Sequence, residues 1–242
     1  SGNPVGGVAV TFAVASGGGS ATGLNQVTGA DGLATIGSWT LGSTAGANTL
    51  TATSGTLGGS PVTFSATGTP AAASQLVITT APSASATNGV ALAQQPVVRI
   101  TDAFGNPVAQ LGTIVSVAAS AGGTIAAGGT AITDALGVAS FSGVVLNGLV
   151  GSYTLDFSAG GLTGAASGSI ALAAGAPSTL VIATQPSGTV VNGNTLAQQP
   201  VLQLTDVGGN ASPTAGVNIT AALTGAPAGV SLGGNATVAT NG

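Results

Sequence analysis

Leu92-Ala93-Gln94-Gln95-Pro96-Val97 is the stretch that decides the fold, because the same six residues return as Leu196-Ala197-Gln198-Gln199-Pro200-Val201. The two copies begin at positions 92 and 196, an offset of 104 residues. Residues 76–106 can be laid over residues 180–210 at this one offset. Helical solenoids and propeller blades repeat over about 20–50 residues, so the longer period predicts a self-contained domain strung along the chain.

A fainter copy of the repeat begins at the other end of the chain, where Gly2-Asn3-Pro4-Val5 matches Gly105-Asn106-Pro107-Val108. We therefore expect the window to open inside one repeat and to close inside another. The expected units are a partial repeat over residues 1–70, a complete repeat over residues 71–174 and a partial repeat over residues 175–242.

Charged side chains are almost absent, since Arg99 is the only basic residue among 242 and the formal net charge is −4. Nucleic acids and anionic membrane surfaces are bound largely through Lys and Arg. The composition therefore predicts that neither is a partner, and we expect no membrane insertion within this window.

The chain contains no Cys and no His. Thiolate nucleophiles, imidazole catalysis, the usual zinc sites and disulfides are excluded by this inventory. Glu is also absent, and the five Asp residues are scattered along the sequence, which does not favour paired-carboxylate catalysis. We expect no enzymatic activity, no catalytic residues and no cofactor.

The hydrophobic pattern is typical of β-strands. Residues 151–157 alternate strictly and predict one strand with Tyr153, Leu155 and Phe157 on a single face. A strand over residues 76–79 is predicted to end at Pro82 and the Asn88-Gly89 turn. Val98 and Ile100 are predicted to point inward from the next strand. About seven such strands within some 100 residues indicate an immunoglobulin-like antiparallel β-sandwich.

In the first repeat, residues 33–39 are predicted to form a strand after the turn at residues 30–32. Ala52 takes the place of Phe157, so volume must be supplied elsewhere in that core. Trp39 and Phe64 are the candidates.

Three turn and strand motifs resemble the bacterial immunoglobulin-like repeats of the invasin and intimin type. That family shows an Asp-x-x-Gly-Asn-Pro-Val turn, a Thr-Asp-x-x-Gly-x-Ala turn and an Ala-Gly-x-Tyr-x-Leu strand. The matching stretches in the middle repeat are residues 102–108, 133–139 and 151–155, and in the first repeat residues 2–5, 28–34 and 45–50.

The match is incomplete at a few positions. The first repeat has Gly29 and Asn48 where the family has Asp and Tyr, and the third repeat has Ala211-Ser212-Pro213 after Asn210. The resemblance implies tandem sandwich domains arranged as beads in a rod, within an extracellular segment of a bacterial surface protein. It brings no catalytic residues.

The turn residues Asp102, Asn106 and Asp134 are candidate calcium ligands, because Ca²⁺ takes hard oxygen donors. Calcium needs six to eight oxygens and each repeat offers few carboxylates, so turn formation is the favoured interpretation and calcium the minor alternative. No other metal site is expected.

Edge strands of sandwiches are usually protected by charges, and this chain has almost none. We therefore expect a structural segment of an extracellular filament, fibre or surface stalk, a rigid spacer whose partners are copies of itself, lateral or end to end, or neighbouring repeats. The alternative is an adhesin module that binds carbohydrate or a cell-surface receptor. The small number of aromatic residues disfavours the alternative, because sugar sites commonly use exposed rings.

Overall fold

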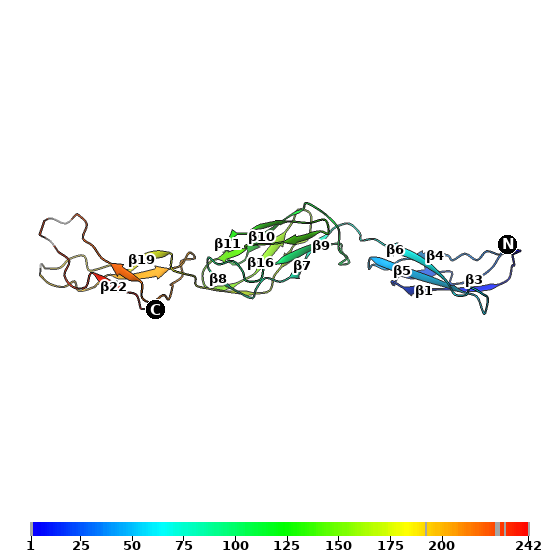
Figure 1. Cartoon of the computed structure of the whole chain (residues 1–242), viewed down its shortest axis with the longest axis horizontal. Helices are drawn as coiled ribbons and strands as arrows, with labels where there is room; N and C mark the ends of the chain where they lie inside the picture. Colours follow the sequence, from blue (N-terminus) through cyan, green and yellow to red (C-terminus); the bar gives the residue numbers. More distant parts are fainter. Residues whose placement is uncertain (1, 192, 226–227, 230, 242) are drawn as a thin grey trace.

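All regular structure in the computed structural model is β, as predicted. The structure describes residues 2–191, 193–225, 228–229 and 231–241. Strand pairing divides these residues into an N-terminal group (residues 9–68), a central sandwich (residues 75–173) and a C-terminal group (residues 179–239). Figure 1 shows the three following one another along the long axis of the molecule.

The central sandwich contains one four-stranded sheet, two three-stranded sheets and one two-stranded sheet around a common interior. Its strands are β7 Gln75–Thr80, β8 Ser85–Thr87, β9 Val97–Thr101, β10 Ile114–Ala119, β11 Thr124–Ala127, β12 Thr130–Ile132, β13 Val138–Ser140, β14 Val145–Asn147, β15 Gly151–Tyr153, β16 Leu155–Ser158, β17 Ala165–Ala166 and β18 Ile170–Ala173. The sheet orders are β12-β10-β16-β17, β13-β9-β7, β15-β18-β8 and β11-β14.

The core of the central sandwich consists of residues that alternate along these strands. Val98 and Ile100 on β9 are fully buried, which confirms the inward prediction. From the opposite sheet, Phe157 packs edge-on against Phe141, with ring centroids 5.2 Å apart. The two sheets are therefore held together by apolar burial across one interior.

The predicted single strand over residues 151–157 is wrong, because the chain changes sheets at Thr154. β15 pairs with β18, whereas β16 pairs with β10 and β17. The Thr154 N–H donates instead to the Ser120 hydroxyl, at 2.8 Å. Tyr153, Leu155 and Phe157 all remain buried, since both sheets border the same core.

Between Pro82 and the predicted turn at Asn88-Gly89 lies a strand, β8, that the sequence pattern missed. β8 runs parallel to β18, with Leu172 opposite Ala86. Apart from this pair and a parallel bridge between Gln75 and Thr163, the described pairing of the sandwich is antiparallel. A strand of three small residues has no hydrophobic alternation by which it could be recognised.

The N-terminal group consists of the sheet β3-β1-β5-β6 and the pair β2-β4. Its strands are β1 Ala9–Ser16, β2 Ser20–Thr22, β3 Asn25–Val27, β4 Ser38–Thr40, β5 Gly46–Thr53 and β6 Val62–Gly68. Of the residues predicted as a strand, 33–39, only the last two lie in a strand, β4, which pairs with β2 as β14 pairs with β11 in the central sandwich. Residues 33–35 align with β13, which pairs with β9, and the described N-terminal group has no strand in the place of β9.

The prediction that Phe64 fills the first core is also wrong. Phe64 is 45% exposed, with its ring centroid 6.5 Å from that of Phe12. Trp39 is half-buried, while Phe12 and Leu50 are buried.

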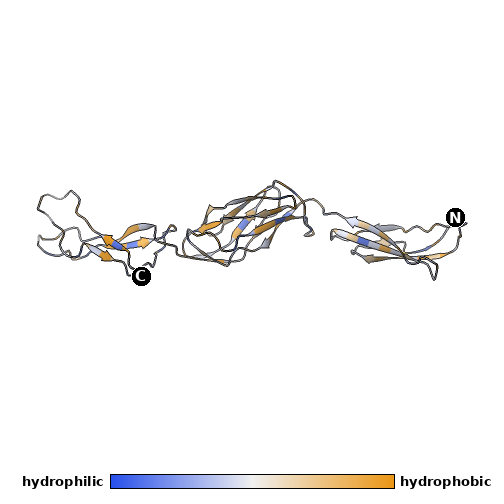
Figure 2. Ribbon diagram, in the orientation of Figure 1, coloured by the Kyte–Doolittle hydropathy of each residue, from blue (hydrophilic) through white to orange (hydrophobic). Residues whose placement is uncertain are grey.

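The C-terminal group consists of two hairpin-like pairs, β19-β20 and β21-β22. Its strands are β19 Thr179–Thr184, β20 Val201–Thr205, β21 Asn218–Thr220 and β22 Thr237–Ala239. Strands in all three groups carry hydrophobic residues, drawn orange in Figure 2. Every strand pair lies within one group, and the division into folding units at residues 70/71 and 174/175 stays a prediction.

In the part of the chain that the structure describes, no helix has the length and apolar character needed to cross a bilayer.

Candidate functional site: two Asp–Asn junctions

The first junction is built on Asp102, the residue that follows β9. Its carboxylate is 1% exposed, and Oδ1 accepts hydrogen bonds from the N–H groups of Phe104 and Asn106, both at 2.9 Å. An aspartate that binds the backbone two residues ahead forms an Asx turn. Gly105 completes the turn with a φ of 85°, a conformation that favours glycine.

The second oxygen of Asp102 holds the segment that connects the N-terminal group to the central sandwich. Oδ2 accepts from the Ala71 N–H at 2.9 Å and from Asn106 Nδ2 at 2.8 Å. Four N–H donors therefore converge on one buried carboxylate. The turn and the connecting segment are fastened to the same group.

Asn106 extends the junction back to the N-terminal group. Its Nδ2 donates to the Ser43 carbonyl oxygen and its Oδ1 accepts from the Ala45 N–H, both at 2.8 Å. Ser43 and Ala45 belong to the loop that precedes β5. A single side chain thus uses both ends of its amide to connect two groups of strands.

The second junction repeats this arrangement one period later. Asp206 Oδ1 accepts from the N–H groups of Gly208 and Asn210, at 2.8 and 2.9 Å, and Oδ2 accepts from Gly175 N–H at 2.8 Å. Asn210 Nδ2 donates to the Gly148 carbonyl oxygen at 2.9 Å, and its Oδ1 accepts from the Val150 N–H at 2.7 Å. Every partner of the first junction has a counterpart in the second.

The second junction carries additional contacts. Asn88 of the central sandwich donates to the Gly148 carbonyl oxygen and accepts from the Gly148 N–H, both at 2.9 Å. A Cβ at Gly208 would collide with that same carbonyl oxygen, so glycine is required there. The Ser212 hydroxyl donates to the Gly175 carbonyl oxygen at 3.0 Å.

Both junction aspartates are held in the ionised form. Burial by itself raises the pKa of Asp102, but the hydrogen bonds from the Asn106 side chain and from the backbone of Ala71, Asn106 and Phe104 outweigh it and lower the pKa to about 2. Hydrogen bonds also outweigh burial at Asp206 and lower its pKa. Each junction therefore contains a negative charge that is neutralised by N–H dipoles, since no cation takes part in these hydrogen bonds.

Of the three calcium candidates, Asp102 and Asn106 are hydrogen-bonded to each other, whereas Asp134 lies in a different turn. Asp134 lies in the turn between β12 and β13, where its Oδ1 accepts from the N–H groups of Leu136 and Val138 at 2.8 and 3.0 Å. Within the described ranges, no three Asp, Glu, Cys or His side chains form a cluster that could hold a metal. The hydrogen bonds of Asp102 and Asn106 are explained without a cation, and the calcium site stays a prediction.

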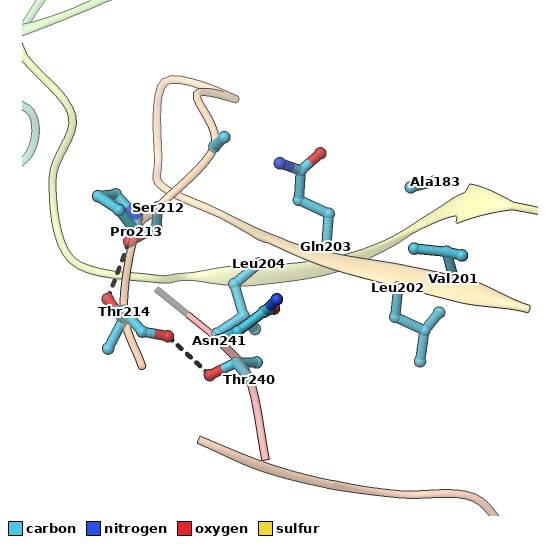
Figure 3. Close-up of a pocket in the computed structure, with 11 residues that line it drawn as sticks. Ala183, Val201, Leu202, Gln203, Leu204, Ser212, Pro213, Thr214, Thr240 and Asn241 are labelled. Atoms are coloured by element: carbon cyan, nitrogen blue, oxygen red, sulfur yellow. Dashed lines mark hydrogen bonds between the residues drawn. The ribbon is translucent and has the colours of Figure 1, made fainter. Parts of the chain in front are cut away.

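The C-terminal group has an open pocket of about 400 Å³ beside β20. Figure 3 shows it bounded by Leu202 and Leu204 on one side and by Thr214 and Thr240 on the other, where the Thr240 hydroxyl donates to the Thr214 carbonyl oxygen at 2.6 Å. In the central sandwich β13 pairs with this edge of the corresponding strand β9. The pocket is lined by aliphatic and neutral polar groups.

Sequence reasoning recognised the Asp-x-x-Gly-Asn stretch as a turn and missed its partners. The signal that could have revealed them is the recurrence of both Asp and Asn at one offset, Asp102 with Asp206 and Asn106 with Asn210. A turn alone needs the Asp and Gly, whereas a second polar side chain implies a further acceptor or donor.

No family model matches this chain. A search of curated proteins also found no similar sequence.

Solved structures match at low similarity. The D0-D1 domain of intimin is 14% identical over 71% of this chain and 84% of that chain, with a TM-score of 0.32. Invasin, titled a bacterial integrin-binding protein, is 15% identical over 93% of this chain and 46% of that chain, with a TM-score of 0.29. A β-glucuronidase of Parabacteroides merdae is 12% identical over 68% of this chain and 21% of that chain, with a TM-score of 0.30. TM-scores near 0.3 carry no inference about function.

Proposed function

We propose that this chain is a structural spacer, a segment of a bacterial extracellular filament, fibre or surface stalk in which β domains are linked in series. The observation that carries the proposal is the repeated junction. Asp102 and Asp206 hold the connecting segments, and Asn106 and Asn210 hold the loops of the preceding groups.

The junction geometry supports stiffness because each connecting segment is fastened at its middle. Ala71 and Gly175 each give their N–H to a carboxylate, so the connecting segments are bound to the following group of strands. A buried, ionised acceptor forms a stronger hydrogen bond than a neutral one. Bending at the junction must break these bonds together with those of the Asn side chain.

The composition suits a surface exposed to hydrolytic enzymes. Trypsin cleaves after Lys and Arg, and the chain has a single such residue, Arg99, within strand β9. β9 is hydrogen-bonded on both sides, to β13 and to β7. We therefore place the segment outside the cell and propose no enzymatic role.

The carbohydrate- or receptor-binding alternative has few exposed rings to support it, chiefly Phe64 and Phe104, which are 45% and 67% exposed. Tyr153, Phe141 and Phe157 are buried in the core, so they present no ring to a sugar. A glycan array probed with the intact chain tests the alternative, and specific, saturable binding would replace the spacer proposal by an adhesin.

The test of the spacer proposal measures the distribution of distances across the first junction. Because the chain has no Cys, spin labels can be placed at the exposed sites Ser65→Cys on β6 and Ser116→Cys on β10 without a background label. Double electron–electron resonance should give a narrow distribution for the labelled chain. Asn106→Ala should broaden it, since two hydrogen bonds to the preceding loop are lost, each worth on the order of 1 kcal/mol.

Asn25→Ala is the matched control, because Asn25 lies exposed on β3 and takes no part in a junction. The distribution should stay narrow in this variant. A broad distribution in the chain with an intact junction, or an unchanged one in Asn106→Ala, would contradict the proposal. Labels across the second junction with Asn210→Ala extend the same test.

A further inference from the structure

Arg99 lies at the centre of one outer face of the central sandwich. Its neighbours along β9, Val98 and Ile100, are fully buried, so Arg99 points to the opposite side of the sheet. Val77 of β7 and Val138 of β13 flank it across the sheet. Arg99, the only positive side chain of the protein, is therefore half-buried among small and aliphatic residues on this face, and its Nε is buried.

Arg99 is not used inside the molecule. Its Nε has no hydrogen-bond partner among the described residues. Asp102 and Asp206 take their hydrogen bonds from amide N–H groups, and Asp134 does the same in its turn. The guanidinium group is left with donors that no described carboxylate accepts.

A single negative side chain lies on the opposite outer face. Asp156 on β16 is exposed, and its neighbours Leu155 and Phe157 are buried, so it points away from the core. Ala118 of β10 and Ala166 of β17 are its cross-strand partners. This face too is formed by small uncharged residues around one charge.

We infer that the Arg99 face of one copy docks on the Asp156 face of a second copy, side by side. The inference rests on the proposed structural function and names its lateral partner. The two faces differ in charge and lie on opposite sides of one sandwich, so the contact is heterologous and can repeat from copy to copy as an open array. Small side chains around each charge let the two sheets approach closely, and no second charge opposes the pairing.

Charge complementarity decides between this pairing and its alternatives. Two Arg99 faces or two Asp156 faces brought together would oppose like charges, whereas the mixed contact joins unlike ones. A single exposed ion pair changes an association constant only about 1.5- to 5-fold. The ion pair therefore determines which faces meet. Apolar contact, repeated over many copies, supplies the remaining free energy of association.

The experiment is sedimentation velocity of the intact chain over a range of concentrations, at low and at high salt. Arg99→Gln, which places at residue 99 the residue found at the equivalent position 203, and Asp156→Asn should each weaken association about 1.5- to 5-fold. Arg99→Asp should weaken it further. The exchange Arg99→Asp with Asp156→Arg should restore association to within about twofold of the original, because the pair is re-formed with its signs reversed.

Mixing the two single variants gives a second measurement of association, which a substitution that merely disturbs folding would not reproduce. Arg99→Gln keeps its acidic face and Asp156→Asn keeps its basic face. An equimolar mixture should associate more than either variant alone, because the Arg99 face of the Asp156→Asn variant can meet the Asp156 face of the Arg99→Gln variant. Thermal unfolding followed by circular dichroism confirms that each variant is folded, and Asp31→Asn, at an exposed site in the N-terminal group, is the control that should leave association unchanged.

Absence of association by the unmodified chain at any concentration would overturn the inference. So would a loss in Arg99→Gln that the charge exchange does not restore, since Arg99 would then recognise some other acidic group. The spacer proposal is tested separately, because the distance distribution across the first junction is measured on dilute, dispersed chains. Failure of lateral association leaves that measurement unaffected.

Discussion

At each junction, two side chains, an Asp and an Asn, make most of the hydrogen bonds that connect neighbouring groups of strands. Asp102 receives four hydrogen bonds and Asn106 joins two groups of strands through one amide. The composition explains this arrangement. Because the chain has almost no basic residues, each buried carboxylate accepts its hydrogen bonds from N–H groups of the backbone and of Asn. The repeat then copies the solution at Asp206 and Asn210.

At the residue scale, the junctions should depend on pH in a defined direction. The pKa of Asp102 is lowered from 3.8 to about 2 in the folded protein, so the folded state favours the ionised carboxylate. The contribution of the ionised Asp102 carboxylate to the stability of the folded state is present in full above about pH 4 and is lost as the pH falls towards 2. Asp206, whose pKa is also lowered, should behave in the same sense.

Double electron–electron resonance across the first junction, on samples frozen at pH 5 and at pH 2, measures this effect. The distance distribution should broaden at pH 2 in the original chain. In Asp102→Asn the difference between the two pH values should shrink, because the titrating group has been removed. Equal widths at both pH values in the original chain would show that the carboxylate is not what holds the junction.

At the scale of elements, consecutive strands of the sandwich can belong to different sheets and still point alternate side chains into the same core. β15 and β16 belong to different sheets, yet Tyr153 and Phe157 fill the same core. Phe157 is 1% exposed and contacts Phe141 edge-on. Stability therefore depends on which face a residue occupies more than on which strand it pairs with.

A pair of matched substitutions tests this statement. Phe157→Ala should lower the free energy of unfolding by about 3–5 kcal/mol, because it removes a buried ring and leaves a cavity. Phe104→Ala, the same chemical change at a position that is 67% exposed, should stay within about 0.5 kcal/mol. Urea unfolding followed by circular dichroism measures both, and similar losses in the two variants would refute the assigned core.

At the scale of the whole molecule, the groups of strands follow one another (Figure 1). They are joined at two points by matching hydrogen bonds of Asn106 and Asn210. If the proposed spacer function holds, force along the axis passes through the two junctions. The low charge of the chain agrees with the proposed lateral contact between copies.

Proteolysis reports on the integrity of the whole chain. Trypsin should leave the folded protein intact for hours, since its one site lies in β9, hydrogen-bonded to strands on both sides. After unfolding in urea it should yield two fragments, residues 1–99 and residues 100–242. Rapid cleavage of the untreated protein would mean that the central sandwich opens far more readily than its fully buried core implies.

The sequence by itself determined the class of fold and the inward face of the main strands. Alternation at Val98 and Ile100, and at Tyr153, Leu155 and Phe157, is a local property of the chain, because successive side chains of any strand point to opposite sides. The Asx turn at Asp102 is local for the same reason, since donor and acceptor lie within four residues. Such features can be predicted from spacing alone.

Only the tertiary structure decided what each of these features contacts. The break at Thr154 and the parallel edge strand β8 depend on distant strands that no local pattern specifies. Asn106 meets Ser43 across 63 positions of sequence, so the amide that joins two groups could be recognised only once the fold had brought them together. Side-chain periodicity predicts which face of a strand is buried. Strand pairing and junction contacts depend on how distant parts of the chain come together in the folded sandwich and in the neighbouring group of strands.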